Sequence, residues 1–399
     1  MMDRYTSAES LVCTLNPQRP VSCIRPKAAH NAAEYFLKNF PGNTLYAVKT
    51  NPHPYILKTL YKSGISQFDV ASLSEAALVR GLLPKAEINF LHPVKNRAAI
   101  ESAYYEYDVR SFAFDSVTEL EKISASTNHS KDLTLLMRLS VSNRYAAHSL
   151  TGKFGVTSAT AATLLKAAAK RCERLGLCFH VGSQCLDPTA YKLALQQIKK
   201  ITCTANVPID IIDVGGGFPS LYPGQDPAPL VDYFSEIKTA LTELSIPNNF
   251  EVWCEPGRAL VAESGSVIAH VDARKNNFLY INDGTYGGLF DAGLLGFRYP
   301  VRCLGKNGST DLKPFIFYGP TCDSLDVMPG PFMLPANITE GDYIEIGLTG
   351  AYSSALRTPF NGFDKLQEAI LEDAPMTSMY SSAESTTAAL NAANYKIFD

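Results

Sequence analysis

Residue types that bind anions and move protons follow several short apolar runs in this sequence. Lys49 comes directly after the apolar LYAV and before Thr-Asn-Pro. The run DVGGGFP (213–219) places three glycines after IDII, and EPGR (255–258) follows FEVWC. Further residues in comparable positions are Asp69, His92, Arg138 and His180 to Ser183. Core packing does not explain why polar residues gather at the ends of apolar runs.

Lys49 is the candidate for covalent chemistry. A lysine that is desolvated and lies near other groups has a lowered pKa and can form a Schiff base with a carbonyl compound. Taken alone, a lysine in this position is usually a surface loop residue. The neighbouring motifs favour the chemical role, because they supply the other parts that such a site needs.

The three glycines Gly215, Gly216 and Gly217 could surround a phosphate with backbone N–H groups, since glycine lets a backbone approach an anion closely. Their spacing differs from the GxGxxG pattern of dinucleotide sites, and no ribose-binding acid follows. Three glycines can also form an ordinary tight turn. A second anion-binding turn in EPGR (255–258) favours the phosphate interpretation.

Glu255 and His180 could both act on a flat aromatic cofactor. A carboxylate beside an arginine can keep a pyridine nitrogen protonated, which makes the ring an electron sink. The alternative for Glu255 is a structural ion pair with Arg258. His180 could stack on the cofactor ring, or it could be an ordinary histidine of the core.

The motif GPTCDSLD (319–326) lies far along the chain. Cys322 offers a thiol that can donate a proton, and the adjacent Asp323 offers a carboxylate for a substrate cation. The alternative is a buried cysteine that packs as a small hydrophobic residue, which is the commonest environment of a lone cysteine.

The elements that position these residues alternate between strands and helices. Eight short apolar runs are predicted strands, at 44–48, 67–71, 88–92, 111–115, 133–139, 177–182, 209–215 and 250–255, and helical patterns such as 158–176 lie between them. Eight such units predict an α/β fold with a (β/α)8 TIM-like barrel, whose active site lies at the carboxyl ends of the strands. The candidate residues stand at those ends.

The composition and pattern of the sequence change after Arg258. Segments 264–273, 277–283, 314–319 and 341–347 are rich in β-branched or aromatic residues and are separated by turn residues. They predict a C-terminal antiparallel β-barrel or sandwich. We therefore expect a barrel domain over 27–262, and a β domain over 263–372 that also includes residues 1–26, which lack a helical period. Residues 373–399, rich in Ser, Thr and Ala, are a predicted mobile tail.

Composition limits the functions that remain. A net charge of −3 argues against a nucleic-acid or membrane-surface role, which needs clustered Lys and Arg. The nine cysteines are scattered without CxxC pairs, which predicts reduced thiols, a cytoplasmic location and no metal site. No apolar run is long enough for a membrane span.

Eight motifs together resemble the ornithine decarboxylase family, the group II pyridoxal-phosphate decarboxylases with the alanine-racemase-like fold. They occur in family order between about residues 20 and 366: AVKTNP, FDVAS, HVGSQC, DVGGGFP, EPGR, NDGTYGG, GPTCDSLD and GAYSSALRTPFNGF. The resemblance implies pyridoxal 5′-phosphate as the cofactor. The wider group includes decarboxylases of diaminopimelate, arginine, lysine and carboxynorspermidine.

The resemblance also implies roles for individual residues. Lys49 would hold the cofactor, His180 would stack on its ring and Glu255 would bind its pyridine nitrogen. Residues implied near the cofactor or its phosphate are Asp69, Arg138, Ser183, Gly215, Gly216, Gly217, Gly257, Arg258 and Tyr352. Cys322 and Asp323 would reach the site from the partner subunit of a homodimer. Lys153 and Asp326 resemble a pair that bridges the two subunits.

One segment departs from the pattern of the eukaryotic members of the family. Those members have an acidic residue for the distal amine of the substrate after the NDG-YG motif, whereas this chain has YGGLFDAGLLGFRYP (286–300) with Asp291 as its single acid. Asp291, Asp323 and Phe360 are therefore the candidate substrate-binding residues. L-Ornithine, converted to putrescine and CO2 in polyamine biosynthesis, is the expected substrate.

Three alternatives stay open. The first is a sister decarboxylase that acts on lysine or arginine. The second is a racemase of the same fold, which would need a tyrosine as proton donor where this chain has Cys322 and Asp323. The third is a catalytically dead regulator of a true decarboxylase. Such relatives typically lose the lysine, the glycines or the cysteine, and this chain keeps all three.

Overall fold

The computed structural model describes residues 2–141, 146–148, 152–244, 250–305 and 311–380. The chain divides into two compact units. We call residues 33–219 and 227–257 the barrel unit, and residues 1–32, 220–226 and 258–399 the β unit. None of the helices within the described residues is long and apolar enough to cross a membrane.

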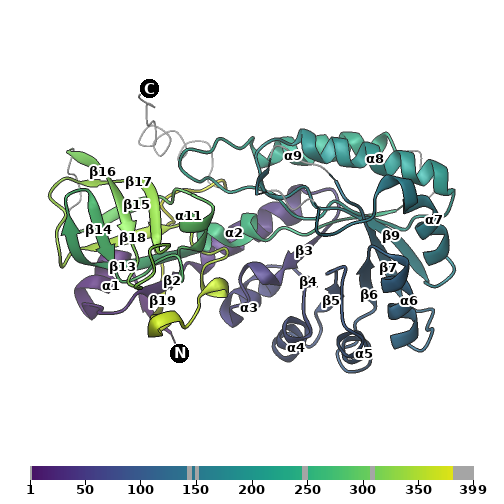
Figure 1. Ribbon diagram of the computed structural model, residues 1–399, viewed down its shortest axis with the longest axis horizontal. Helices are drawn as coiled ribbons and strands as arrows, with labels where there is room; N and C mark the ends of the chain where they lie inside the picture. Colours follow the sequence, from purple (N-terminus) through teal and green to yellow (C-terminus); the bar gives the residue numbers. More distant parts are fainter. Residues whose placement is uncertain (1, 142–145, 149–151, 245–249, 306–310, 381–399) are drawn as a thin grey trace. The chain divides into compact units, whose positions relative to one another are not determined.

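The barrel unit contains a closed barrel of eight parallel strands, counted over the described residues (Figure 1). In chain order they are β3 (Asn43–Ala47), β4 (Gln67–Val70), β5 (Glu87–Phe90), β6 (Ser111–Phe114), β7 (Thr134–Arg138), β9 (Arg174–Cys178), β11 (Ile211–Asp213) and β12 (Glu251–Cys254). The pairing of Trp253 in β12 with Asn43 in β3 closes the ring. The predicted (β/α)8 barrel is therefore confirmed.

Helices follow the strands and lie on the outside of the barrel (Figure 1). They are α3 (Pro54–Lys62), α4 (Leu73–Leu82), α5 (Arg97–Tyr105), α6 (Val117–Ser126), α7 (Ser158–Ala168), α8 (Thr189–Ala205) and α9 (Leu230–Thr242), and α2 (Pro26–Asn39) precedes β3. Ser72, Asn96 and Ser116 cap the first turns of α4, α5 and α6, because each side chain accepts a hydrogen bond from a backbone N–H three residues later.

A ring of buried side chains fills the interior of the barrel. It consists of Leu45, Leu91, Ala113, Leu136, Cys178, Ile211 and Trp253. Because side chains alternate between the two faces of a strand, the residue two positions later points inward again, nearer the carboxyl end. The residues two positions after Leu136, Cys178, Ile211 and Trp253 are Arg138, His180, Asp213 and Glu255. A polar layer therefore lies directly on an apolar one.

One helix and the strand that follows it differ most from their predicted bounds. The predicted helix over 158–176 ends at Ala168, and the predicted strand over 177–182 is β9, Arg174–Cys178. Leu175 and Leu177 pair with Leu135 and Met137 of β7, and this long-range pairing takes the last turns away from the helix. His180 consequently lies beyond the end of the strand.

The β unit contains a sheet of nine strands, counted over the described residues. They are β1 (Asp3–Tyr5), β2 (Val21–Ile24), β13 (Gly265–Lys275), β14 (Phe278–Ile281), β15 (Val301–Leu304), β16 (Leu312–Tyr318), β17 (Val327–Pro335), β18 (Tyr343–Gly347) and β19 (Gln367–Leu371). Most pairings are antiparallel, as predicted, but β1 with β19, β19 with β2, and β14 with β16 are parallel. The four predicted strands correspond to β13, β14, β16 and β18.

Short elements complete the two units. They are β8 (Ala146–His148), β10 (Ser183–Cys185), α10 (Arg258–Val261), α11 (Phe290–Leu294) and the 3-10 turns η1 (Val48–Thr50), η2 (Ala262–Ser264), η3 (Ser354–Leu356) and η4 (Phe360–Gly362). The expectation that the first residues lack a helix is wrong, because α1 spans Ala8–Leu15. Ser7 and Ser10 form a reciprocal cap at its start, and this short-range signal was present in the sequence.

The predicted mobile tail is described only in part. Residues 381–399 lie outside the described residues. Before them, Asp373 pairs with Arg25 at 2.9 Å, and the carboxylate of Glu263 accepts hydrogen bonds from Ser378 and the backbone of Met379 at 2.6 Å each. The mobility of the tail stays a prediction.

Candidate active site

Lys49 lies in η1, directly after β3 of the barrel unit. Its ammonium is 3.7 Å from the carboxylate of Asp69 in β4, and the Lys49 side chain is 41% exposed whereas that of Asp69 is 4% exposed. Burial, and then the charge of Glu255, raise the pKa of Asp69 to about 7, against the opposing effect of Lys49. The arrangement leaves a reactive amine accessible beside a buried carboxyl group.

His180 has an uncharged ring at this end of the barrel. Its Nδ1 accepts a hydrogen bond of 3.0 Å from the backbone N–H of Gly182, so that nitrogen carries no proton. Burial, and then the charges of Arg138 and Lys49, hold the pKa of His180 well below its usual value. A neutral, flat ring with a fixed orientation is suited to stacking on another ring.

The glycine run packs against both His180 and Glu255. A Cβ on Gly215 would lie 1.9 Å from the carbonyl oxygen of Phe179, and a Cβ on Gly216 would lie 2.6 Å from that of Glu255 and 3.1 Å from His180 Nε2. Gly217 has a φ of 106°, which side chains disfavour. These positions therefore require glycine, because neighbouring backbone occupies the space that a side chain would need.

Glu255 is buried in the polar layer beside Asp213. Burial, and then the charge of Asp213, hold the pKa of Glu255 well above its usual value, while Lys49 and Arg138 oppose that shift. Burial also raises the pKa of Asp213 to about 6. No separate role was predicted for Asp213 from the sequence. The signal was its position two residues after Ile211, on the face that points into the barrel.

Arg258 and Asp291 form a buried ion pair in the β unit. Arg258 Nη1 lies 2.9 Å from Asp291 Oδ2 and donates a hydrogen bond of 2.8 Å to the hydroxyl of Tyr222. The guanidinium carbon also lies 5.0 Å from the centre of the Tyr352 ring. The structure thus brings two predicted cofactor residues, Arg258 and Tyr352, together with the predicted substrate residue Asp291, and adds Tyr222, for which the sequence predicted no role.

The motif with Cys322 and Asp323 also lies in the β unit, beside the segment that contains Phe360. Cys322 is exposed, so the alternative of a buried structural thiol is wrong for this chain. Its backbone N–H donates a hydrogen bond to Asn361. The carboxylate of Asp323 accepts hydrogen bonds from the Tyr286 hydroxyl and the backbone of Leu325, and these bonds lower the pKa of Asp323.

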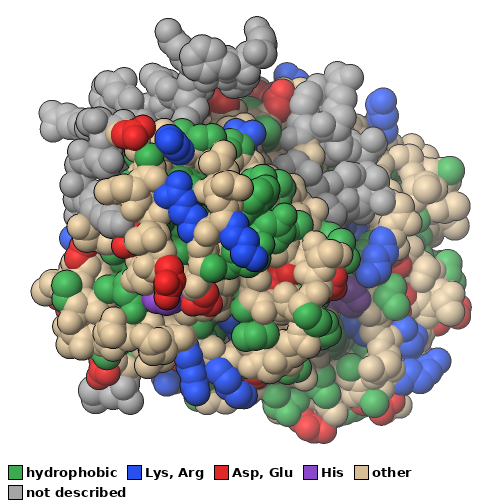
Figure 2. Space-filling model, turned by 60° about the vertical axis from the view of Figure 1, so that its left-hand side comes forward, with side chains coloured by type: hydrophobic (Ala, Val, Ile, Leu, Met, Phe, Trp, Pro, Cys, Tyr) green, Lys and Arg blue, Asp and Glu red, His purple; other side chains and the backbone are tan. Residues whose placement is uncertain are grey.

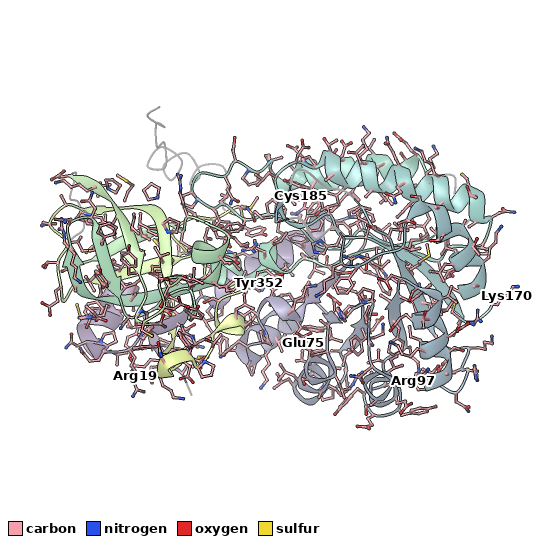
Figure 3. All side chains as sticks on the ribbon, in the orientation of Figure 1. Arg19, Glu75, Arg97, Lys170, Cys185 and Tyr352 are labelled. Atoms are coloured by element: carbon pink, nitrogen blue, oxygen red, sulfur yellow. The ribbon has the colours of Figure 1, made fainter. Side chains whose placement is uncertain are left out.

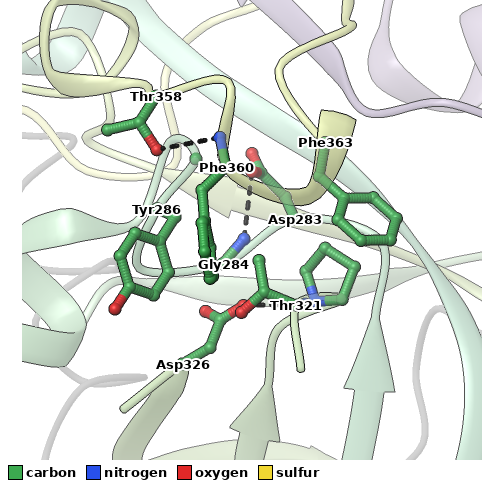
Figure 4. A pocket seen from close by; sticks show the side chains of 10 residues that line it. Asp283, Gly284, Tyr286, Thr321, Asp326, Thr358, Phe360 and Phe363 are labelled. Carbon is green, nitrogen blue, oxygen red and sulfur yellow. Dashed lines mark hydrogen bonds between the residues drawn. The ribbon is translucent and has the colours of Figure 1, made fainter. Parts of the chain in front are cut away.

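A small pocket lies at the meeting point of these segments (Figure 4). It is lined by Asp283, Gly284, Tyr286, Gly287, Pro320, Thr321, Asp326, Thr358, Phe360 and Phe363. The rings of Tyr286 and Phe360 are 5.0 Å apart, and Asp283 forms an ion pair of 2.8 Å with Arg357. A Cβ on Gly287 would lie 1.7 Å from Asp283 Oδ1, which explains the glycine in NDGTYGG.

Asp326 and Lys153, the predicted bridging pair, occur in different surroundings. Asp326 is buried and accepts hydrogen bonds from Thr285 and Thr321 at 2.7–3.0 Å, so it stabilises this loop. Lys153 is exposed, with its ammonium 4.9 Å from the centre of the Phe154 ring. The intersubunit bridge stays a prediction.

Comparison with known proteins identifies the family. Residues 27–262 match the model of the pyridoxal-dependent decarboxylases, pyridoxal binding domain. The chain is 35% identical over 350 residues to an ornithine decarboxylase of Panagrellus redivivus, which covers 80% of this chain and 78% of that one. It is 32% identical over 352 residues to a lysine/ornithine decarboxylase of Selenomonas ruminantium, with 86% and 87% covered. The chain belongs to the pyridoxal-dependent decarboxylases.

A solved structure supports the same fold for this decarboxylase. The crystal structure of the arginine decarboxylase of Paramecium bursaria Chlorella virus matches it with a TM-score of 0.80 and 26% identity, covering 91% of this chain and 100% of that one. The cofactor of the decarboxylase is pyridoxal phosphate. The barrel unit fits it, because Lys49, the unprotonated His180, the buried Glu255 and the Gly215–Gly217 run offer an amine, a flat ring, a carboxyl group and a side-chain-free backbone.

The remaining predicted cofactor residues fall into both units. Arg138 ends β7 and Ser183 begins β10, and both are half-buried in the barrel unit. Gly257 lies against Thr50, where a Cβ would approach Thr50 Oγ1 to 2.0 Å. Tyr352 lies in the β unit and is labelled in Figure 3. Their contacts with the cofactor stay predictions.

Proposed function

We propose that this decarboxylase acts on a basic amino acid and prefers L-ornithine, which it converts to putrescine and CO2 for polyamine biosynthesis. The observation that carries the proposal is the environment of Asp323. Hydrogen bonds from Tyr286 and Leu325 favour its ionised form. Asp323 follows the exposed Cys322 in the chain, and its partner Tyr286 lines the pocket with Phe360. A fixed carboxylate at such a place suits the distal ammonium of a diamino acid.

Residues of the barrel unit provide the cofactor site in this proposal. When bound, pyridoxal phosphate supplies a ring that accepts the electron pair left by departing CO2. Lys49 would hold the cofactor through its amine. Glu255 would bind the pyridine nitrogen, and His180 would stack on the ring. Asp69, Arg138, Ser183, Gly215, Gly216, Gly217 and Gly257 are the other proposed cofactor residues of this unit, and Arg258 and Tyr352 are those proposed from the β unit.

Cys322 and Asp323 provide the substrate side of the reaction. Cys322 would donate the proton that Cα takes up once CO2 has left, and the Lys49 amine would serve in release of the diamine. Asp323 binds the distal ammonium, while Phe360 packs on the aliphatic part of the substrate. These tasks need an accessible thiol and an accessible aromatic ring, and Cys322 and Phe360 are both exposed.

Asp291 is the second carboxylate that we propose for the distal ammonium. Its buried ion pair with Arg258 supports a competing role, in which Asp291 positions Arg258 for the cofactor phosphate. A variant that keeps the charge but lengthens the side chain separates these roles, because it changes the space for the substrate but not the charge beside Arg258.

We also propose that the active protein is a homodimer with each site shared between subunits. Large apolar side chains near Cys322 support an interface at this surface, since Leu325 is 69% exposed, Phe363 44% and Phe360 40%. On the face shown in Figure 2, Lys and Arg side chains are interspersed with Asp, Glu and uncharged side chains. We place the protein in the cytoplasm, because all nine cysteines are free.

A substrate panel tests the proposal against its alternatives. We expect measurable turnover of ornithine and lysine, with kcat/KM for ornithine higher by roughly 10- to 200-fold, since one methylene is worth about 1–3 kcal/mol in a pocket. Arginine and diaminopimelate should be poorer. A higher kcat/KM for lysine or arginine would replace ornithine as the substrate. Absence of turnover by the cofactor-loaded protein on all four would favour the dead regulator.

A further inference from the structure

Asp213 and Glu255 stand side by side at the ends of neighbouring barrel strands. They follow Ile211 and Trp253 of the apolar ring by two residues each and point into the barrel. The register pairs Asp213 with Trp253, so Glu255 lies two residues further toward the carboxyl end. The backbone holds this register, because Val214 N–H donates to Trp253 at 2.9 Å and Glu255 N–H donates to Gly215 at 2.8 Å. Both side chains are buried, Asp213 completely.

The hydrogen bonds of the two carboxyl groups indicate that the pair holds one proton. Asp213 Oδ1 accepts a bond of 2.8 Å from the backbone of Gly215, and the Asp213 and Glu255 side chains are hydrogen-bonded to each other. As ionised groups, Asp213 Oδ2 and Glu255 Oε1 would be buried without a hydrogen-bond partner among the described residues. One proton held between the side chains removes that cost.

The groups around the pair do not replace this proton. Lys49 and Arg138 favour ionisation of Glu255, but the charge of Asp213 and burial outweigh them. Asp69 adds a further negative charge that opposes ionisation of Asp213. His180 is uncharged. Two carboxylates in contact without water cannot both ionise at little cost, as in other buried carboxyl pairs.

We propose that Asp213 is a positioning residue that shares one proton with Glu255, and that Glu255 transfers this proton to the pyridine nitrogen when the cofactor binds. The inference rests on the proposed cofactor site. In the transfer, the O–H bond of the pair breaks and an N–H bond forms on the ring, so no proton is taken from solvent. Asp213 then stabilises the protonated ring as a second negative charge behind Glu255.

The full-length protein without cofactor gives the first test. Carboxyl groups with a raised pKa in the folded state contribute stability that is present below their unfolded pKa and is lost as pH rises through the folded pKa. With the pKa of Asp213 raised to about 6 and that of Glu255 held well above normal, urea unfolding should show stability that falls as the pH rises from the unfolded carboxyl pKa of about 4 through about 6 and beyond. Asp213→Asn and Glu255→Gln should each flatten this fall.

If the two residues share one proton, the effects of the two substitutions on the pH dependence of stability should not be additive. The double variant Asp213→Asn with Glu255→Gln should flatten the fall by less than the sum of the single variants, because either change already removes the carboxyl–carboxyl contact. Asp232→Asn removes an exposed carboxylate in the first turn of α9 and should leave the fall unchanged. Additive effects, or no effect of Asp213→Asn, would overturn the proposal.

Infrared spectroscopy of the wild-type protein covers the case in which the variants fail to fold. At about pH 8 the cofactor-free protein should retain a carbonyl band of a protonated carboxyl group, and loading with pyridoxal phosphate should remove it, since the proton moves to the ring. A band that persists after loading, or that is absent before it, contradicts the transfer. Neither experiment involves a substrate, so a negative result leaves the substrate panel unaffected.

Discussion

The carboxyl end of the barrel, with Asp69, Asp213 and Glu255 (the barrel mouth), and the loop with Cys322 and Asp323 (the Cys322 loop) shift the pKa of their acidic residues in opposite directions. In the barrel unit, Asp69, Asp213 and Glu255 are buried, and burial raises the pKa of each carboxyl group. In the β unit, Asp323 lies in a loop beside an exposed thiol, and hydrogen bonds lower its pKa. One region retains protons on its acids, and the other retains a negative charge.

This difference matches the two tasks of a pyridoxal-dependent decarboxylase. A cofactor ring that accepts electrons needs neighbours that can hold or give a proton, and a buried carboxyl pair does so. A substrate with a distal ammonium needs a carboxylate that stays ionised while the substrate enters and leaves. We infer that changes in the barrel mouth affect the cofactor and all substrates, whereas changes in the loop affect substrate binding first.

The largest effect is expected from Lys49→Ala, which removes the amine that holds the cofactor. Nearly all turnover should be lost for every substrate, together with the visible absorbance of the bound cofactor. Lys58→Ala removes an exposed lysine in α3 and should change neither property, which makes it the matched control. Turnover close to wild type in Lys49→Ala would show that another amine does the chemistry.

The next effect is expected from Asp323→Asn, which keeps the shape of the side chain but removes its charge. We expect kcat/KM for ornithine and lysine to fall by on the order of a hundredfold or more, because the distal ammonium loses its partner. Cofactor absorbance should stay unchanged, in contrast to Lys49→Ala. Asp311→Asn, an exposed acid elsewhere in the β unit, serves as the control. Equal kinetics of Asp323→Asn and wild type would place the ammonium elsewhere.

A subunit-mixing experiment tests whether Lys49 of one subunit and Cys322 of the other form one active site. Inactive Lys49→Ala and inactive Cys322→Ala proteins, mixed and allowed to exchange subunits, should regain about a quarter of wild-type activity, since half of the dimers then contain one intact site of two. Exchange is checked independently with differently tagged subunits. A mixture that stays inactive despite exchange would show that Cys322 acts within its own chain.

Asp291 gives the smallest and most informative difference. If it binds substrate, Asp291→Ala lowers kcat/KM for ornithine and lysine at saturating cofactor, and Asp291→Glu shifts the ratio between them by shortening the pocket. If it positions Arg258, Asp291→Ala weakens cofactor binding and removes roughly 3–5 kcal/mol of unfolding free energy, as expected for one half of a buried ion pair. The cofactor dissociation constant and the ornithine KM distinguish these results.

The two regions also differ in how much of their structure could be predicted from the sequence. The barrel could be predicted because its signals are local: apolar runs alternate with capped helices, and the residues at strand ends, Lys49, His180 and Glu255, do gather in one unit. Asp213 was overlooked because it stands inside a glycine motif. Its importance comes from its side-chain contact with Glu255 next to the neighbouring strand, and pairing with another strand is not visible locally.

The β unit was harder to predict for a physical reason. Tyr286, Asp323 and Phe360 come from three segments that meet only in the folded chain, and the pairing of Arg258 with Asp291 joins residues 33 positions apart. The bounds of β9 were misplaced because its pairing with β7 overrides the helical pattern before it. The α1 helix depends on a two-serine cap, which an apolar period alone does not reveal.

Covalent labelling of the cofactor-loaded protein tests most directly whether Lys49 is the centre of this site. Borohydride reduction fixes the cofactor to the amine that holds it, and peptide mapping then locates the modified lysine. We predict a single major label on the peptide that contains Lys49, absent from Lys49→Ala and present in Lys58→Ala. A label on another lysine, or no label in protein that nevertheless decarboxylates ornithine, would contradict the account.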